Sequence, residues 1–230
     1  MRTNYIFSAG VKNIMNNPSY QYEDLTMIPF QSGPLLNNTY LIADRKSKEC
    51  IAIDPSFFFE QVLEKIDREQ WNFKAIWLTH AHFDHIAGIR SAVKSYPQIP
   101  IAMHPDDEII RENGGIASNS SAGQEKYCPK PAIHLRDGMT LAVGKYEFQV
   151  LHTPGHAPGH CCFYQKEAGW LFTGDLIFYH DCGRTDLLGG NPAALMNSIR
   201  EKILTLPDET LIFPGHEEFS SVGAEKPYYK

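Results

Sequence analysis

Long apolar runs and basic clusters are both missing from this sequence of 230 residues. None of its apolar stretches approaches the ~20 residues that a membrane-spanning helix needs. The net charge is −6 and no run of lysine or arginine occurs, so we expect neither nucleic acid nor a membrane as a partner. The first 25 residues lack an apolar core followed by a cleavage site, so we do not expect a signal peptide. These absences predict a cytoplasmic protein.

Cysteine is scarce, and its pattern predicts no disulfide framework. The five cysteines are an odd number, two of them are adjacent, and no C-x-x-C pair occurs. Such a pattern is typical of reduced, buried thiols. Cys182 lies in a glycine-flanked loop, and we interpret it in the same way, as a small buried side chain.

Strand-like and helix-like segments alternate along the chain. Short apolar runs predict strands at 25–30, 38–44, 50–54, 74–80, 99–105 and 209–215, and paired runs predict hairpins at 139–153 and 160–175. Apolar residues at helical spacing predict helices at 57–70, 86–97, 106–113 and 191–206. Because such alternation is typical of a layered α/β domain, we expect one over residues 25–230, after an N-terminal extension of residues 1–24.

An irregular segment separates the two halves of the pattern. Residues 113–138 carry much glycine, serine, asparagine and proline and show little periodicity. A segment of this length is usually a functional lid or binding loop, and a plain surface loop is the alternative. The sequence favours neither.

The most unusual stretch, residues 78–88, reads LTHAHFDHIAG. It places His80, His82, Asp84 and His85 within six positions after an apolar run. A single histidine most often has a structural role, but four such groups crowded together compete or repel unless a cation lies between them. Imidazole and carboxylate suit zinc, iron or manganese. An extended backbone would point His80 and His82 to one face, with Asp84 and His85 in the turn that follows. We therefore predict a metal site at the carboxyl end of a strand.

Three more potential ligands follow apolar runs in the same manner. They are His156, Asp175 and His216, each directly after a glycine. Glycine permits a sharp turn and a close approach of the backbone. Five histidines and two aspartates at inferred strand ends are too many for coincidence, so we expect them to meet at one centre. We interpret the other candidates, His104, His134 and His152, as structural.

The order of these motifs resembles the metallo-β-lactamase superfamily. The segments THAHFDH, TPGHAPGH, TGD and FPGHE carry the resemblance, preceded by NNTYLI and AIDPS, and it extends from about residue 25 to the end. The segments GDLIFYHDCGRTDLLGG and SIREKILTLPDETLIFPGH resemble the short glyoxalase II-like branch, that of the hydroxyacylglutathione hydrolases. The resemblance implies a four-layer αββα sandwich of two mixed β-sheets flanked by helices, with metals in a cleft at one edge of the sheets.

The resemblance also implies a role for each residue of the cluster. One metal ion would be bound by His80, His82 and His156, the other by Asp84, His85 and His216, and Asp175 would bridge them. Two divalent ions are implied, zinc first, with iron or manganese as alternatives. Asp54 would orient the histidine-rich turn from behind, and His160 is a candidate for a similar outer position.

The implied activity is hydrolysis of a small-molecule thiolester, an S-2-hydroxyacylglutathione or a similar compound, by a hydroxide that bridges the metal ions. Asp84 and Asp175 are the catalytic residues in this interpretation, and Asp84 would assist proton transfer while it remains a ligand. Because a thiolate is a good leaving group, no strong general acid is needed. The chain offers no obvious one outside the cluster.

A persulfide dioxygenase is the main alternative, since DCGRTDLLGG resembles a loop of those enzymes too. It would use one iron ion at His80, His156 and Asp175, because two histidines and a carboxylate leave positions open for oxygen. A β-lactamase is less expected, since the usual lactamase patterns place no aspartate at position 175. A non-catalytic metal-binding protein is also less expected, because all seven ligand positions carry a histidine or an aspartate.

Substrate contacts are expected from Tyr179, His180, Arg184 and Lys226. Arg184 could instead pair with Asp186, and Lys226 could be ordinary surface. Long glyoxalase II enzymes hold glutathione with the help of a C-terminal helical domain. Few residues follow His216, so we expect no such domain and no glutathione binding of that kind. The sequence predicts no oligomeric state.

Overall fold

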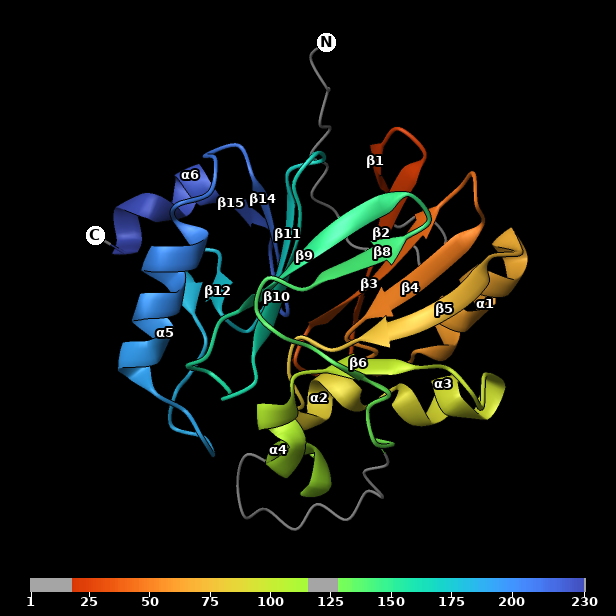
Figure 1. Ribbon diagram of the computed structural model, residues 1–230, viewed down its shortest axis with the longest axis horizontal. Helices are drawn as coiled ribbons and strands as arrows, with labels where there is room; N and C mark the ends of the chain where they lie inside the picture. Colours follow the sequence, from red (N-terminus) through yellow and green to blue (C-terminus); the bar gives the residue numbers. More distant parts are fainter. Residues whose placement is uncertain (1–17, 116–127, 230) are drawn as a thin grey trace.

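Two β-sheets pack face to face between two groups of helices in the computed structural model, which describes residues 18–115 and 128–229. Figure 1 shows helices from the C-terminal part of the chain, in blue, beside one sheet. Helices from the N-terminal half, in yellow to green, lie beside the other sheet. The four-layer αββα sandwich expected from the sequence is confirmed.

The first sheet has seven strands, which lie side by side in sequence order. The first four are antiparallel to their neighbours and the last three run parallel to the fourth, so the sheet is mixed. The third and fourth strands are buried almost throughout, as apolar runs predict for strands covered on both faces. The strands are β1 (Tyr20–Tyr22), β2 (Leu25–Ser32), β3 (Asn37–Asp44), β4 (Glu49–Ile53), β5 (Asn72–Trp77), β6 (Ile101–Met103) and β7 (Ile133–His134).

The second sheet has six strands in the order β15-β14-β11-β10-β9-β8. The two hairpins expected from the sequence are confirmed as β8–β9 and β10–β11, and β14 adds in parallel to β11. A small separate hairpin, β12–β13, follows β11. The strands are β8 (Thr140–Val143), β9 (Tyr146–His152), β10 (Cys161–Gln165), β11 (Trp170–Gly174), β12 (Ile177–Phe178), β13 (Asp181–Cys182), β14 (Leu211–Pro214) and β15 (Ser220–Ser221).

The helices form where helical spacing predicts them. The helix expected at 191–206 is present: the Asn191 side chain accepts a hydrogen bond of 3.0 Å from the Ala194 N–H, and Pro192 occupies the first turn. The α-helices are α1 (Glu60–Glu69), α2 (Phe83–Ile86), α3 (Ile89–Ser95), α4 (Glu108–Glu112), α5 (Pro192–Ser198) and α6 (Val222–Glu225). The other helical segments are η1 (Pro105–Asp107), η2 (Ile199–Ile203) and η3 (Lys226–Tyr229). Of these, η2 is a π-helix that continues α5. The sequence pattern predicts none of the short elements after residue 216.

Three apolar clusters fill the three interfaces between the four layers. Phe59 and Ile89 belong to the cluster between the first sheet and its helices, and Leu195 belongs to the cluster between the second sheet and α5. The central cluster is rich in aromatic side chains, and the rings of Trp77 and Phe148 meet edge to face at 5.3 Å. This packing fixes the strand ends of the two sheets relative to each other.

Two details differ from expectation. Asp84 and His85 lie in α2 and not in a turn, because the backbone becomes helical directly after the extended His82. Residues 20–22 of the expected N-terminal extension pair with β2, while residues 1–17 lie outside the described residues. Residues 116–127 of the irregular 113–138 segment lie outside them as well. None of the helices in the described ranges has the length and apolar character needed to cross a membrane.

Candidate metal centre

All seven side chains expected to bind metal meet near the carboxyl ends of strands from both sheets. His80 and His82 follow β5, and Asp84 and His85 lie in α2. The other three come from the second sheet, where His156 follows β9, Asp175 follows β11 and His216 follows β14.

The glycines before these residues are needed for close packing. A Cβ atom at Gly215 would lie 2.3 Å from Oδ1 of Asp175, and one at Gly174 would lie 2.4 Å from Oγ1 of Thr79. Both separations are far below van der Waals contact. The strand ends could not approach so closely with any side chain at these two positions.

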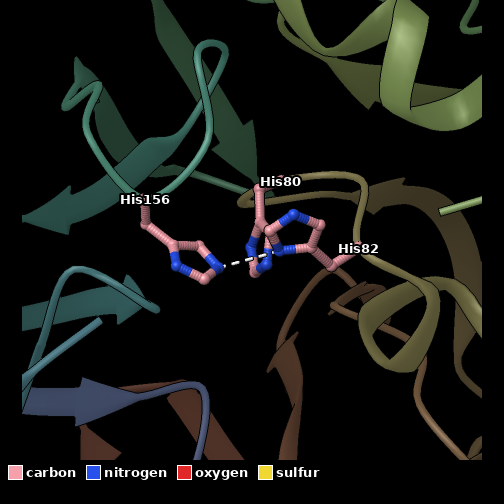
Figure 2. Close-up of side chains that lie close together, drawn as sticks. All are labelled: His80, His82 and His156. Carbon is pink, nitrogen blue, oxygen red and sulfur yellow. Dashed lines mark hydrogen bonds between the residues drawn. The ribbon is translucent and has the colours of Figure 1, made fainter. Parts of the chain in front are cut away.

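The first group consists of His80, His82 and His156. One nitrogen of each ring lies within 4.8 Å of those of the other two, and Figure 2 shows the three rings turned toward one another. The closest approach is 2.8 Å, between Nδ1 of His82 and Nε2 of His156. All three rings are buried, and Nε2 of His80 has no hydrogen-bond partner in the described part of the chain. A buried nitrogen without a partner is costly, and a cation between the rings would remove that cost.

Neighbouring acceptors decide which nitrogen carries the proton in two of these rings, His80 and His156. Nδ1 of His156 lies 2.8 Å from the Arg184 carbonyl oxygen, which can only accept, so Nε2 keeps its lone pair. The Thr79 hydroxyl donates to Oδ2 of Asp54 at 2.6 Å, so its oxygen accepts from Nδ1 of His80 at 3.0 Å. Nε2 of His80 is therefore unprotonated too. Nδ1 of His82 faces the lone pair on Nε2 of His156 at 2.8 Å, so one positive ion between the two rings could bind both nitrogens.

The second group consists of Asp84, His85 and His216. Nε2 of His216 lies 3.3 Å from Nε2 of His85 and 3.3 Å from Oδ2 of Asp84. Nδ1 of His216 donates to the Leu35 carbonyl oxygen at 2.8 Å, which again leaves Nε2 free to bind a cation. The Asn37 amide donates to Oδ2 of Asp84 at 2.8 Å and fixes the orientation of that carboxylate.

Asp175 lies between the two groups. Its Oδ1 is 3.3 Å from Nε2 of His85, and its Oδ2 is 3.3 Å from Nε2 of His216 and 3.5 Å from Nε2 of His156. One carboxylate therefore contacts histidines of both groups, which is the position that a bridging ligand needs.

The protonation of the groups follows from burial and from the neighbouring charges. Burial lowers the pKa of His80 and His156, and it lowers that of His82 to about 3. Burial acts to raise the pKa of Asp84, but His85 and a hydrogen bond from His216 outweigh it and lower the pKa to about 2. Burial also acts to lower the pKa of His216, but Asp175 and Asp84 raise it to about 10. Asp84 and Asp175 are thus ionised, and their negative charge keeps His216 protonated. A divalent cation can take the place of that proton.

Two residues support the cluster from outside. Asp54 accepts hydrogen bonds from the Thr79 N–H at 2.8 Å and from Nδ1 of His85 at 2.9 Å, so it fixes the orientation of the His85 ring. His160 accepts from the Asp175 N–H at 3.1 Å through Nε2, which leaves Nδ1 to donate to Oγ1 of Thr153 at 2.9 Å. It therefore holds the backbone of Asp175 and does not face the cavity.

Asp107 also supports the site, although no sequence motif predicts this role. This carboxylate is fully buried and accepts hydrogen bonds from the Ala81 N–H at 2.9 Å and the Gly159 N–H at 2.6 Å. It therefore connects the loop of His80 with the loop of His156, across the two halves of the sandwich. Burial raises the pKa of Asp107 to about 7. In the sequence it is an ordinary acidic residue near a helix start, and no local signal distinguishes it.

A cavity of about 400 Å³ opens beside the cluster. Five of the seven expected ligands lie on its wall, namely His82, Asp84, His156, Asp175 and His216. Of the four residues expected to contact substrate, Arg184 lines this cavity, where its guanidinium binds both carboxylate oxygens of Asp186 at 2.6 and 2.7 Å.

The other three expected substrate contacts do not line the cavity. The ring of His180 is stacked between Tyr179 and Tyr228 at centroid distances of 3.8 and 4.0 Å. Lys226 forms an ion pair with Asp208. A role of Tyr179, His180 and Lys226 in substrate binding stays a prediction.

Comparisons with known sequences agree with this site. The model of the metallo-beta-lactamase superfamily matches residues 32–216. The probable metallo-hydrolase YqgX of Bacillus subtilis is 36% identical over 196 residues, which cover 84% of this chain and 91% of that protein. The hydroxyacylglutathione hydrolase GloC of Haemophilus influenzae is 33% identical over 196 residues, which cover 82% of this chain and 89% of that protein.

Solved structures share the whole fold. TTHA1623, crystallised in a di-iron-bound form, has a TM-score of 0.77 and 37% identity, with 86% of this chain and 96% of that chain covered. The B3 metallo-beta-lactamase BLEG-1 has a TM-score of 0.77 and 34% identity, with 87% and 96% covered. The matched residues include every one of the seven that meet at the cluster. The chain therefore belongs to the metallo-beta-lactamase superfamily, and its histidine and aspartate clusters are those of a protein that binds divalent metal ions.

Proposed function

We propose that this protein is a dinuclear metallohydrolase that cleaves thiolesters, with an S-2-hydroxyacyl thiolester as its substrate type. The observation that carries the proposal is the position of Asp175, whose carboxylate contacts histidines of both groups. Such a carboxylate suits two cations better than one. The similarity to GloC supports a thiolester as the substrate.

The donor set fits two divalent ions. His80, His82 and His156 would hold one and Asp84, His85 and His216 the other, with Asp175 shared by both. Nitrogen and oxygen donors suit zinc, which we propose, and also iron or manganese. Two such ions would supply a hydroxide nucleophile at neutral pH and would stabilise the negative charge on the carbonyl oxygen under attack.

The side chains of this protein position the reaction. Asn37 holds Asp84 in place by its hydrogen bond of 2.8 Å, so the second oxygen of that carboxylate is available to accept a proton from the nucleophile. The cavity beside the cluster lets the thiolester carbonyl approach. The leaving thiol has a pKa of about 8.5 as a free cysteine-type group, so it departs as a thiolate and needs no protein acid.

Metal analysis combined with three assays tests the proposal. We expect two metal ions per chain and hydrolysis of S-lactoyl thiolesters. One iron per chain with oxygen uptake on glutathione persulfide would instead support a persulfide dioxygenase. The similarity to BLEG-1 makes nitrocefin hydrolysis the third measurement, and turnover of nitrocefin without thiolester turnover would refute the proposal.

A further inference from the structure

Four apolar side chains form much of the cavity wall outside the ligands. They come from separate parts of the chain: Leu35 after β2, Phe83 in α2, Phe178 in β12, and Leu187. Leu35 and Phe83 are unusually exposed for their size, at 46% and 42% of their surface. Large apolar side chains exposed around a cavity are typical of a site that packs against an uncharged part of its ligand.

The charged side chains on this wall, apart from the ligands, are Asp181, Arg184 and Glu217. Arg184 is the only cation among the described wall residues, and its guanidinium is already bound at two points to Asp186. Asp181 and Glu217 are exposed, and no ion pair of either is found within the described ranges. The charge left over on the wall outside the metal-binding cluster is therefore negative.

The thiol moiety is the larger part of a small hydroxyacyl thiolester, so it covers the wall once the carbonyl is at the cluster. A carboxylate on that moiety would meet Asp181 and Glu217. The one cation among the described residues of the wall, Arg184, would have to leave Asp186 to reach it. Like charges at this range disfavour binding, and the low dielectric of a cavity strengthens the effect. The same two carboxylates would attract a cationic group.

We propose that the cavity selects thiolesters whose thiol moiety carries no net negative charge and packs its apolar part on Leu35 and Phe83. This inference rests on the proposed thiolesterase function. It concerns the same site but a different property, the charge of the leaving thiol.

Three lactoyl thiolesters of similar size test it, made from thiocholine, N-acetylcysteamine and 3-mercaptopropionate, which are cationic, neutral and anionic. We expect kcat/KM to fall in that order, with the anionic compound roughly tenfold below the neutral one at low salt. Added salt should reduce the difference, because it screens charges at the cavity rim. Equal or faster turnover of the anionic compound would overturn the inference.

Glu217→Gln links the preference to the wall. In this variant the ratio of kcat/KM for the neutral substrate to kcat/KM for the anionic substrate should fall by about threefold, and the metal content should stay the same. Glu218→Gln is the matched control, because Glu218 is an exposed neighbour that does not line the cavity. It should leave the ratio unchanged, and an equal effect of both variants would overturn the assignment to Glu217.

The two proposals fail in different ways. If the metal-loaded protein hydrolyses none of the three thiolesters, nor S-lactoylglutathione, the proposed function is wrong and this inference falls with it. If it hydrolyses them all but prefers the anionic thiol moieties, the function stands and the charge selection alone is wrong.

Discussion

Asp54→Asn should weaken the second metal site, to which His85 belongs. Asp54 has a backbone φ of 49°, a left-handed conformation that asparagine adopts readily, so the exchange adds no backbone strain. The carboxylate accepts from the Thr79 N–H through Oδ1 and from both the Thr79 hydroxyl and Nδ1 of His85 through Oδ2. The Thr79 N–H cannot reverse its role, so the amide oxygen of the introduced asparagine would stay there, and its NH2 group would face His85.

The magnitude follows from the proton on His85. To bind a metal through Nε2, His85 must carry its proton on Nδ1, which would then point at a second donor. A buried donor without an acceptor costs about 1–3 kcal/mol. This corresponds to a loss of roughly 5- to 150-fold in affinity for the second ion, in line with the ~10- to 100-fold typical of residues behind metal ligands.

A competition titration against a chelating dye measures the two binding steps. We expect the second ion to bind Asp54→Asn more weakly than it binds the original protein. The first site should weaken as well, because the Thr79 hydroxyl loses the acceptor that keeps the His80 proton on Nδ1. Asp44→Asn is the control, because Asp44 is also buried and accepts a backbone N–H at 2.9 Å, but lies at the opposite end of β3 from Asn37. Unchanged affinity for both ions in Asp54→Asn would contradict the reasoning about the His85 proton.

Three further predictions concern neighbouring residues. Asp175→Ala should lose both metal ions and lower turnover by more than about 10³-fold, because one carboxylate serves both groups; normal hydrolysis of S-lactoylglutathione with metal retained would contradict its bridging position. Gly159→Ala should lower the melting temperature by several degrees and weaken the first site, because the added Cβ would lie 2.7 Å from the Asp107 nitrogen. Calorimetry and metal titration measure the two effects. No change in either would show that the loop can shift to accommodate the methyl group. The pKa of Asp107, raised by burial from its ordinary 3.8 to about 7, means that its protonated form favours the folded state. The metal-free protein should therefore lose stability relative to Asp107→Asn as the pH rises from about 4 to about 7; urea unfolding measures this, and a pH-independent difference would exclude the shift.

The sequence pattern predicted a layered α/β domain and the seven clustered side chains because their signals are local, whereas the four-layer arrangement followed from the family resemblance. Each ligand segment follows an apolar run, and glycine precedes His156, Asp175 and His216. The need for Gly215 becomes clear only in three dimensions, where it contacts Asp175. A parallel strand pair then brings segments together that are distant in the chain.

The parts that the sequence did not predict depend on contacts across the fold. Asp107 acts through two backbone N–H groups, one of them at Gly159, 52 positions away, and no spacing rule reports such a contact. His180 was expected near the substrate because it follows Asp175 closely, but Tyr228 from the C-terminal segment stacks on it. The helical conformation of Asp84 was missed because a four-residue helix is too short to show periodicity.

Each cation-binding group takes two side chains from the first half of the chain and one from the second, and Asp175 adds a donor from the second half to both. Neither half of the molecule alone presents a full set of donors. A complete set of donors for either ion therefore requires that the two halves have docked, and each bound ion would hold the two halves together. Removing the ions from the folded protein should therefore lower its stability as well as its activity.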